Sequence, residues 1–225
     1  MQFKGFSPEG LEFLKDLAAN NNKEWFEKFR SVYQEHLLKP LKQLTTELGP
    51  AISSIDPEID TTPAINRTIS KIFRDVRFSN DKSPFRTLQW ISFRRPNKIW
   101  GNVPEFYFYF TPEEYHTGMG FYSATPANMG KFREHIDLYP ERFARIIDLY
   151  NTHGQYAVEG EEYKKTFPNE RGPEYQRWYR KKNLYVTDTR KIDDLFFSSE
   201  LEQKIEDDFN NHSLLYLFLI ESIFG

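Results

Sequence analysis

The first third of the chain carries apolar residues at helical spacing. Ser7-Pro8 is typical of a helix start, because serine caps the free amides and proline fits the first helical position. Asn21, with a glutamate three residues later, resembles a capping box and predicts a second, longer helix. Pro40 must kink or restart that helix because proline cannot donate the interior hydrogen bond. The apolar spacing continues to Gly49-Pro50, where we expect the helix to stop.

A further helix is predicted over residues 65–76. Its apolar side chains are Ile65, Ile69, Ile72, Phe73 and Val76. This i, i+4, i+7, i+8, i+11 spacing favours a helix. A strand over residues 69–78 would instead place Arg74 between Ile72 and Val76 on one face, which is a less natural arrangement.

The middle of the chain predicts an antiparallel β-meander over about residues 88–123. Its central strand alternates strictly, with Phe106, Phe108 and Phe110 on one face and Tyr107 and Tyr109 on the other. A turn at residues 111–114 leads into a strand over residues 115–123. Aromatic side chains on both faces of the central strand indicate that helices cover one face and that a loop or a partner covers the other.

The rest of the chain predicts more helices. One begins at Thr125-Pro126, the next at Pro140, and others over residues 198–210 and at the apolar C-terminus, whereas residues 154–196 are polar and predicted to be irregular. No repeat or linker divides the sequence. The predicted fold class is therefore α+β, a single domain over residues 1–225 in which N-terminal and C-terminal helices pack on the meander.

Composition and charge exclude several classes of protein. The chain has 225 residues and no cysteine, which excludes disulfides, thiolate catalysis and cysteine-ligated metals. A net charge of −3 and a pI near 6.0 argue against a general nucleic-acid binder. The start, MQFKGFSPEG, lacks the pattern of a secretory signal, and the apolar run 214–220 is too short to span a membrane. We therefore expect a cytoplasmic protein with no membrane partner.

Motifs of known catalytic and cofactor chemistry are missing from the sequence. There is no P-loop and no nucleophile elbow, and the five histidines are scattered without ligand spacing, so we expect no metal and no cofactor. A weak nucleic-acid candidate is the patch formed by Arg177, Trp178, Arg180, Lys181 and Lys182. The favoured interpretation of this patch is an amphipathic surface helix that buries Trp178, and a nucleic-acid partner is not expected.

The stretch FRDVRFSNDKSPFRT, residues 73–87, combines four cations, two carboxylates and three phenylalanines. Guanidinium groups such as those of Arg74 and Arg77 suit bidentate recognition of a carboxylate or a phosphate. Three interpretations stay open: a structural network of ion pairs, an anion-binding site, and a catalytic centre with Asp75 as the candidate base.

The same stretch resembles the signature of a family of bacterial conserved hypothetical proteins, the domain of unknown function 2461. That signature is approximately R-x-x-R-D-x-R-F, then an acid or amide with lysine, then tyrosine. The matching positions here are Lys71, Arg74-Asp75, Arg77-Phe78, Asp81-Lys82 and Phe85. Residues 3–41, Gly118-Met119-Gly120 and the helix with Phe132-Arg133 are also similar to the family, so the resemblance covers nearly the whole chain.

Two positions depart from that signature. Lys71 stands in place of arginine and loses the guanidinium fork, and Phe85 stands in place of tyrosine and lacks the hydroxyl that a proton-transfer mechanism there would need. The family carries no established activity, so the resemblance implies membership and no reaction.

The leading functional hypothesis is a protein or enzyme that binds a small anionic ligand. The candidate ligand-binding residues are Arg74, Arg77, Asp81, Lys82 and Arg133, and Asp75 is the candidate catalytic residue. Arg133 is included because it shares an inward helix face with Met129 and Phe132, and an inward arginine needs an anionic partner. The alternative is an interaction or structural module, in which the charged stretch is an ion-pair brace and the aromatic sheet face binds a partner.

Overall fold

The fold was analysed in a computed structural model that describes residues 2–77, 80–96, 102–164, 167 and 171–225. The chain forms two compact units. Unit 1 contains residues 1–93, 107–117 and 189–208, and unit 2 contains residues 94–106, 118–188 and 209–225. The single domain expected over residues 1–225 stays a prediction.

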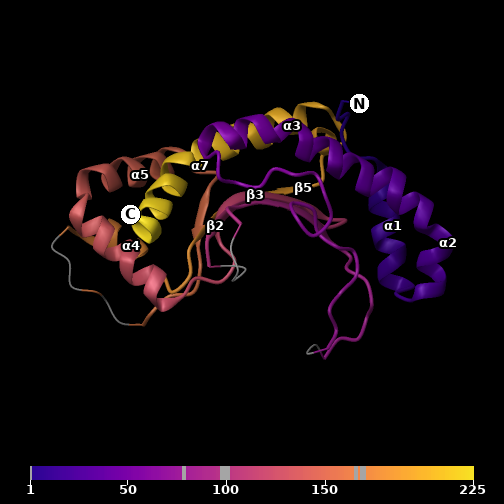
Figure 1. Cartoon of the computed structure of the whole chain (residues 1–225), viewed down its shortest axis with the longest axis horizontal. Coiled ribbons are helices and arrows are strands. Elements are labelled where there is room, and N and C mark those ends of the chain that lie inside the picture. Colours follow the sequence, from indigo (N-terminus) through magenta and orange to yellow (C-terminus); the bar gives the residue numbers. More distant parts are fainter. Residues whose placement is uncertain (1, 78–79, 97–101, 165–166, 168–170) are drawn as a thin grey trace. The chain divides into compact units, whose positions relative to one another are not determined.

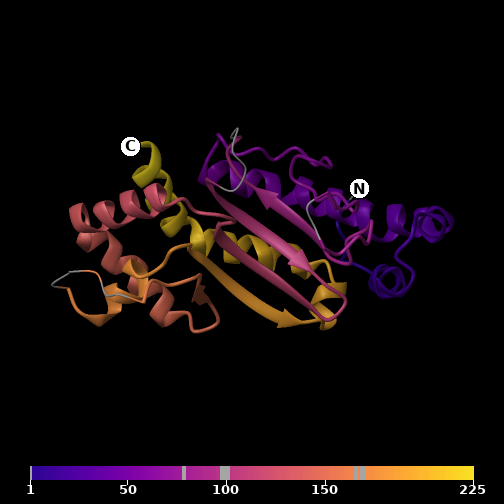
Figure 2. The same cartoon turned by 90° about the horizontal axis from the view of Figure 1, so that it is seen from below.

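The predicted α+β class and the antiparallel meander at residues 88–123 are confirmed (Figure 1). The strands are β1 (Gln89–Phe93), β2 (Pro104–Phe110), β3 (Glu114–Phe121), β4 (Ala157–Glu159) and β5 (Tyr185–Lys191). They form one sheet in the order β1-β2-β3-β5-β4, which can be followed in Figure 2. The α-helices are α1 (Pro8–Ala19), α2 (Lys23–Tyr33), α3 (Lys39–Ile55), α4 (Pro126–Leu138), α5 (Pro140–Thr152), α6 (Pro173–Tyr179) and α7 (Glu200–Phe224). A π-helix, η1 (Gln34–Leu38), joins α2 to α3, and a 3-10 helix, η2 (Asp194–Phe197), precedes α7.

The start of α1 matches the sequence prediction, whereas two other helix boundaries differ from it. Ser7 caps α1, but α2 is capped by Asn22, whose side chain accepts a hydrogen bond from the Trp25 amide at 3.0 Å. The predicted stop at Gly49-Pro50 is wrong, because α3 continues through Pro50 to Ile55. Proline costs a helix one hydrogen bond, and seven buried residues along α3 provide packing that offsets this loss.

Pro40 lies at the junction between η1 and α3. The wider π turn directly precedes it, and the Lys39 amide donates to the carbonyl oxygen of Gln34, five residues back. The carbonyl that a proline at position 40 would disturb in an ordinary helix is that of His36, inside the π turn. A Cβ atom at Gly10 would lie 2.7 Å from this carbonyl oxygen, so α1 packs against η1 at a distance that only glycine allows.

The helix predicted over residues 65–76 is wrong. Asn66 has a φ of 70°, in the left-handed region, residues 66–68 form a turn, and isolated β-bridges at Ile65, Ile69 and Phe73 lie along the segment. It pairs alongside β1, where the Ser70 amide donates to the carbonyl of Trp90 at 3.0 Å and the Ser92 amide donates to the carbonyl of Thr68 at 2.8 Å. The isoleucine spacing was compatible with a helix, but pairing with β1 satisfies the backbone and still buries the side chain of Ile69.

In unit 1, α3 and the first residues of α7 lie over one face of the strands (Figure 1). The core on this face is aromatic: the ring of Phe6 lies 4.7 Å from that of Phe110 and 4.9 Å from that of Phe196, centroid to centroid. Phe108 is also fully buried, whereas Tyr107 and Tyr109 on the opposite face are half-buried. The two faces of β2 therefore differ as its alternation predicts.

In unit 2, the core forms around Phe143, whose ring lies 5.2 Å from those of Trp178 and Phe218. The helices predicted at Thr125-Pro126 and Pro140 are present as α4 and α5.

The prediction that residues 154–196 are irregular is wrong, because they contain β4, α6, β5 and most of η2. The alternation of β5 was hidden because it buries polar residues, Thr187 and Asp188, beside Val186. An apolar pattern therefore could not identify this strand from sequence.

Candidate functional site

Residues 71–86 of unit 1 form a loop, here called the charged loop, that carries most of the predicted site residues. Phe78 and Ser79 lie outside the described residues. The guanidinium of Arg77 binds the carboxylate of Asp75 through two nitrogens, with Nη2 to Oδ2 at 2.6 Å and Nε to Oδ1 at 2.9 Å. Arg74 pairs with Asp81. Both arginines thus contact carboxylates of their own loop.

The exposure of these pairs decides how much they stabilise the loop. The side chains of Arg77 and Asp75 are 76% and 56% exposed, and those of Arg74 and Asp81 are 26% and 55% exposed. Ion pairs in contact with water contribute little to folding, because solvent already stabilises both charges. The pair of Arg77 and Asp75 is therefore held weakly, and Arg74 is the more enclosed of the two arginines.

The carboxylates of the charged loop have lowered pKa values. Hydrogen bonds from Arg77 hold the pKa of Asp75 at about 2, and hydrogen bonds from Ser83 and then Arg74 lower the pKa of Asp81. Asp75 is thus ionised at neutral pH and is a weak base in this arrangement. Its observed role is to accept hydrogen bonds from the side chain and the amide of Arg77.

Lys82 and Arg86 of the charged loop contact backbone carbonyls. Lys82 Nζ donates to the carbonyl of Val76 at 3.0 Å. Arg86 donates to the carbonyls of Lys71 and Phe73, and its guanidinium lies 5.1 Å from the ring centroid of Trp90. These contacts tie the two arms of the loop together.

The charged loop is anchored to the turn between α1 and α2. The side-chain amide of Asn21 donates to the carbonyl of Phe85 and accepts from its amide, both at 3.0 Å. The ring of Phe85 stacks on Phe26 at 4.3 Å and lies 5.0 Å from Phe73. Asn21 thus provides the two hydrogen bonds that a neighbouring strand would provide, and the sequence pattern could not predict this contact because the partners are 64 residues apart.

Arg133 lies in unit 2, on α4, so it is not among the residues that the charged loop brings together. Its guanidinium donates to three backbone carbonyls: those of Tyr179 and Lys181 at 2.7 Å and that of Met129 at 3.0 Å. It also lies 4.4 Å from the ring centroid of Phe167. Burial lowers its pKa. The anionic partner expected for this arginine is thus replaced, in these contacts, by carbonyl oxygens, which satisfy a guanidinium equally well in geometry.

The basic patch at residues 177–182 is built as an amphipathic element. Trp178 of α6 is buried, as the favoured interpretation predicts. Lys181 Nζ lies 2.9 Å from the carboxylate of Glu162, Arg180 Nη2 lies 3.2 Å from the same group, and Lys182 pairs with Glu161. Acidic partners thus accompany Arg180, Lys181 and Lys182.

A group that sequence reasoning missed lies on the outer face of the sheet in unit 1. Its members are Glu114 and His116 of β3, Thr189 of β5 and Tyr109 of β2. His116 Nδ1 lies 2.8 Å from Thr189 Oγ1, and Nε2 lies 3.1 Å from Glu114 Oε1. The spacing of Glu114 and His116 puts both on one face of a strand and was readable, but Thr189 is 73 residues away.

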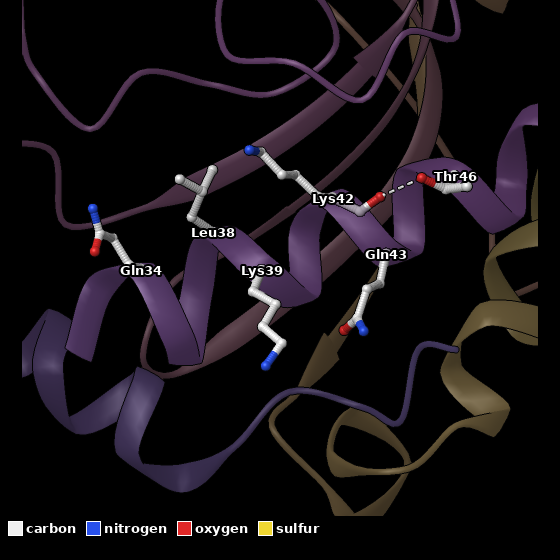
Figure 3. A pocket seen from close by; sticks show the side chains of 6 residues that line it. All are labelled: Gln34, Leu38, Lys39, Lys42, Gln43 and Thr46. Carbon is white, nitrogen blue, oxygen red and sulfur yellow. Dashed lines mark hydrogen bonds between the residues drawn. The ribbon is translucent and has the colours of Figure 1, made fainter. Parts of the chain in front are cut away.

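An open hollow of about 590 Å³ runs along the exposed side of η1 and α3 (Figure 3). It is lined by Gln34, Leu38, Lys39, Lys42, Gln43 and Thr46. Lys39 pairs with Glu35, and the hydroxyl of Thr46 donates to the carbonyl of Lys42 at 2.8 Å. None of the predicted site residues lines it.

Two absences concern the described part of the chain. No group of three or more histidine and acidic side chains there could hold a metal ion. No described helix has both the length and the apolar character needed to cross a membrane.

Comparison with known proteins bears on the resemblance carried by the charged loop. A search among curated proteins found no match. The model of the family described as "Conserved hypothetical protein (DUF2461)" matches residues 9–218, which include most of each unit and the whole charged loop. The chain therefore belongs to the DUF2461 family of conserved hypothetical proteins.

Proposed function

We propose that this protein binds a small anionic ligand, a phosphate or a carboxylate, at the charged loop of unit 1. One observation carries the proposal: the pair of Arg77 and Asp75 is exposed to solvent, on a loop that other contacts hold in place. An anion that replaces Asp75 on Arg77 displaces a weak partner. The guanidinium of Arg77 can then donate two parallel hydrogen bonds to two oxygens of the anion.

The alternative role of these charges, an ion-pair brace, requires partners shielded from water. Removing one member of a pair is costly only when the other is left buried. Asp75 and Asp81 are each more than half exposed, whereas Asn21 and Phe85 supply buried or half-buried contacts that fix the loop. The anchor is therefore separate from the charges, and this separation favours a recognition role for Arg77.

The charge of the loop also supports anion binding. Residues 71–86 contain five cations and two carboxylates, within a chain of net charge −3. A local excess of positive charge attracts anions and raises their rate of encounter. Lys82 uses one of its three donors on a carbonyl, and Asp81 holds Arg74 in position. The proposed ligand contact is thus Arg77 first, with Lys82 and Arg74 as further candidate cations of the same loop, whereas a contribution from Arg133 stays a prediction.

The test compares the thermal stability of the wild type and Arg77→Ala, alone and with phosphates, nucleotides and carboxylates. We expect the variant to unfold close to the wild type without ligand. An anion should raise the melting temperature of the wild type, and the variant should lose this shift. Arg30→Ala is the matched control, because Arg30 forms an exposed pair with Glu27 in the same unit, and it should keep the shift.

Two results would contradict the proposal. One is a wild type that responds to no anion of the panel, together with a large loss of stability in Arg77→Ala, which would favour the brace. The other is an equal ligand shift in the wild type and Arg77→Ala, which would place the anion elsewhere.

A second candidate function places the ligand on the aromatic sheet face of unit 1. The half-buried Tyr107 and Tyr109 favour it, because their rings are partly accessible while the phenylalanines of β2 are not. The nucleotides of the same panel present a flat ring to such a face. A nucleotide shift that is lost in Tyr107→Ala and kept in Arg77→Ala would support this candidate over the charged loop.

A further inference from the structure

Three polar side chains converge on the outer face of the sheet in unit 1. His116 lies between Thr189 Oγ1, 2.8 Å from Nδ1, and Glu114 Oε1, 3.1 Å from Nε2. Its side chain is 11% exposed, whereas Thr189 is exposed to solvent. The imidazole is therefore enclosed between two partners, and the residue at one end of the group, Thr189, is exposed to solvent.

The chemistry of the partners fixes the direction of both hydrogen bonds. An ionised carboxylate can only accept, so His116 Nε2 must carry a proton and donate the hydrogen bond that Glu114 accepts. In the neutral ring, Nδ1 then holds the lone pair and must accept from Thr189. The hydroxyl of Thr189 thus donates to His116 Nδ1, which can act as a base. Glu114 favours this tautomer of His116 because it accepts the hydrogen bond from Nε2.

The ring of His116 is also held in orientation. It stacks on the ring of Tyr109 with centroids 4.1 Å apart and planes 11° from parallel. Stacking on one side and hydrogen bonds at both nitrogens leave the imidazole little freedom to turn. A nucleophile, a base within hydrogen-bond reach and a third group that orients the base is the arrangement that activates hydroxyl groups in acyl transfer.

We infer that Thr189 is a nucleophile activated by His116, with Glu114 as a positioning residue, and that the substrate class is an ester. Thr189 Oγ1 forms a bond to the carbonyl carbon of the ester while His116 Nδ1 takes its proton. The carbon–oxygen bond to the alcohol breaks, and the alcohol leaves with that proton. Water then attacks the acyl group on Thr189, releasing the acid and restoring the hydroxyl.

The test uses a fluorophosphonate probe, which forms a covalent bond to activated hydroxyl oxygens with loss of fluoride. The full-length protein is incubated with the probe, and the modified residue is located by peptide mass spectrometry. We expect modification of Thr189, at least 100-fold slower in His116→Gln, since a general base typically contributes a factor of about 10² to 10⁴. Thr62, an exposed threonine of unit 1, is the internal control and should stay unmodified.

Two further variants keep the inference falsifiable. Thr189→Ser has a less hindered hydroxyl and should be modified at least as fast as the wild type. Glu114→Gln should slow the modification while leaving the melting temperature unchanged, an effect that a purely structural role would not produce. Absence of modification in both the wild type and Thr189→Ser, or equal rates in the wild type and His116→Gln, would overturn the inference.

This inference goes beyond the proposed anion-binding function and does not depend on it. The probe reports on Thr189, whereas the ligand shift reports on Arg77. A negative result in the labelling experiment therefore does not affect the interpretation of the ligand shift, and the reverse also holds.

Discussion

Replacing Asn21 with alanine should detach the charged loop from the turn between α1 and α2. The Asn21 side chain makes two hydrogen bonds to the backbone of Phe85, each 3.0 Å long. A typical intramolecular hydrogen bond contributes a net of about 0.5–1.5 kcal/mol, so the pair should contribute about 1–3 kcal/mol to the free energy of unfolding. The loss should lie toward the upper end, because both backbone groups of Phe85 lose their side-chain partner at once.

Urea titration of the wild type and Asn21→Ala measures this difference as a shift of the unfolding midpoint at an unchanged slope. Asn21→Asp is the informative companion, because its carboxylate can still accept from the Phe85 amide but faces the Phe85 carbonyl without a proton to donate. It should therefore lose at least half of the stability lost by the alanine variant. A loss below about 0.5 kcal/mol in Asn21→Ala would refute the view that this side chain anchors the loop.

Three further predictions follow from single residues. Tyr33 has a buried hydroxyl with no hydrogen-bond partner among the described residues, and burial raises its pKa to about 12. Tyr33→Phe should therefore leave the free energy of unfolding unchanged or raise it in the same urea titration, and a loss of stability above about 1 kcal/mol would contradict this. Gly120 has a φ of 157°, and a Cβ atom there would lie 2.4 Å from the Cα atom of Tyr185, so Gly120→Ala should lower the melting temperature strongly, whereas Gly130→Ala, with open space around its Cβ position, should not. The pKa of Asp75 is lowered from 3.8 to about 2 by Arg77, so the contribution of this pair to the free energy of unfolding is complete above pH 3.8 and is lost as the pH falls toward 2. Any difference in stability between the wild type and Arg77→Ala at pH 6 should therefore vanish between pH 3.8 and pH 2. A difference that persists at pH 2 would argue against this pairing.

The parts of the fold that could be predicted are those in which one face is apolar. The strict alternation of β2 placed its phenylalanines in the core and its tyrosines on the other face, as observed. The helix predicted over residues 65–76 was wrong because isoleucines at helical spacing were also compatible with a non-helical segment. Hydrogen bonds to β1, some twenty residues away, determine its conformation. β5 was not predicted because its buried positions include the polar side chains Thr187 and Asp188.

The same distinction applies to the candidate site. The pairing of Arg77 with Asp75 involves residues two apart, and its components were visible as a charged stretch. The anchor at Asn21 and the contact of His116 with Thr189 join residues 64 and 73 positions apart. Such contacts depend on the order of helices and strands in space, which periodicity does not encode.

The π-helix η1 sets the rotational phase between the helices on either side of it. A π turn holds one residue more than an α turn, and each residue of an α-helix turns the chain by about 100°. The extra residue in Gln34–Leu38 therefore changes the direction in which the side chains of α3 point relative to those of α2. The helical stretch from Lys23 to Ile55 thus changes the face that it buries without an intervening loop, and inserting or deleting a residue between Tyr33 and Pro40 would change that face again.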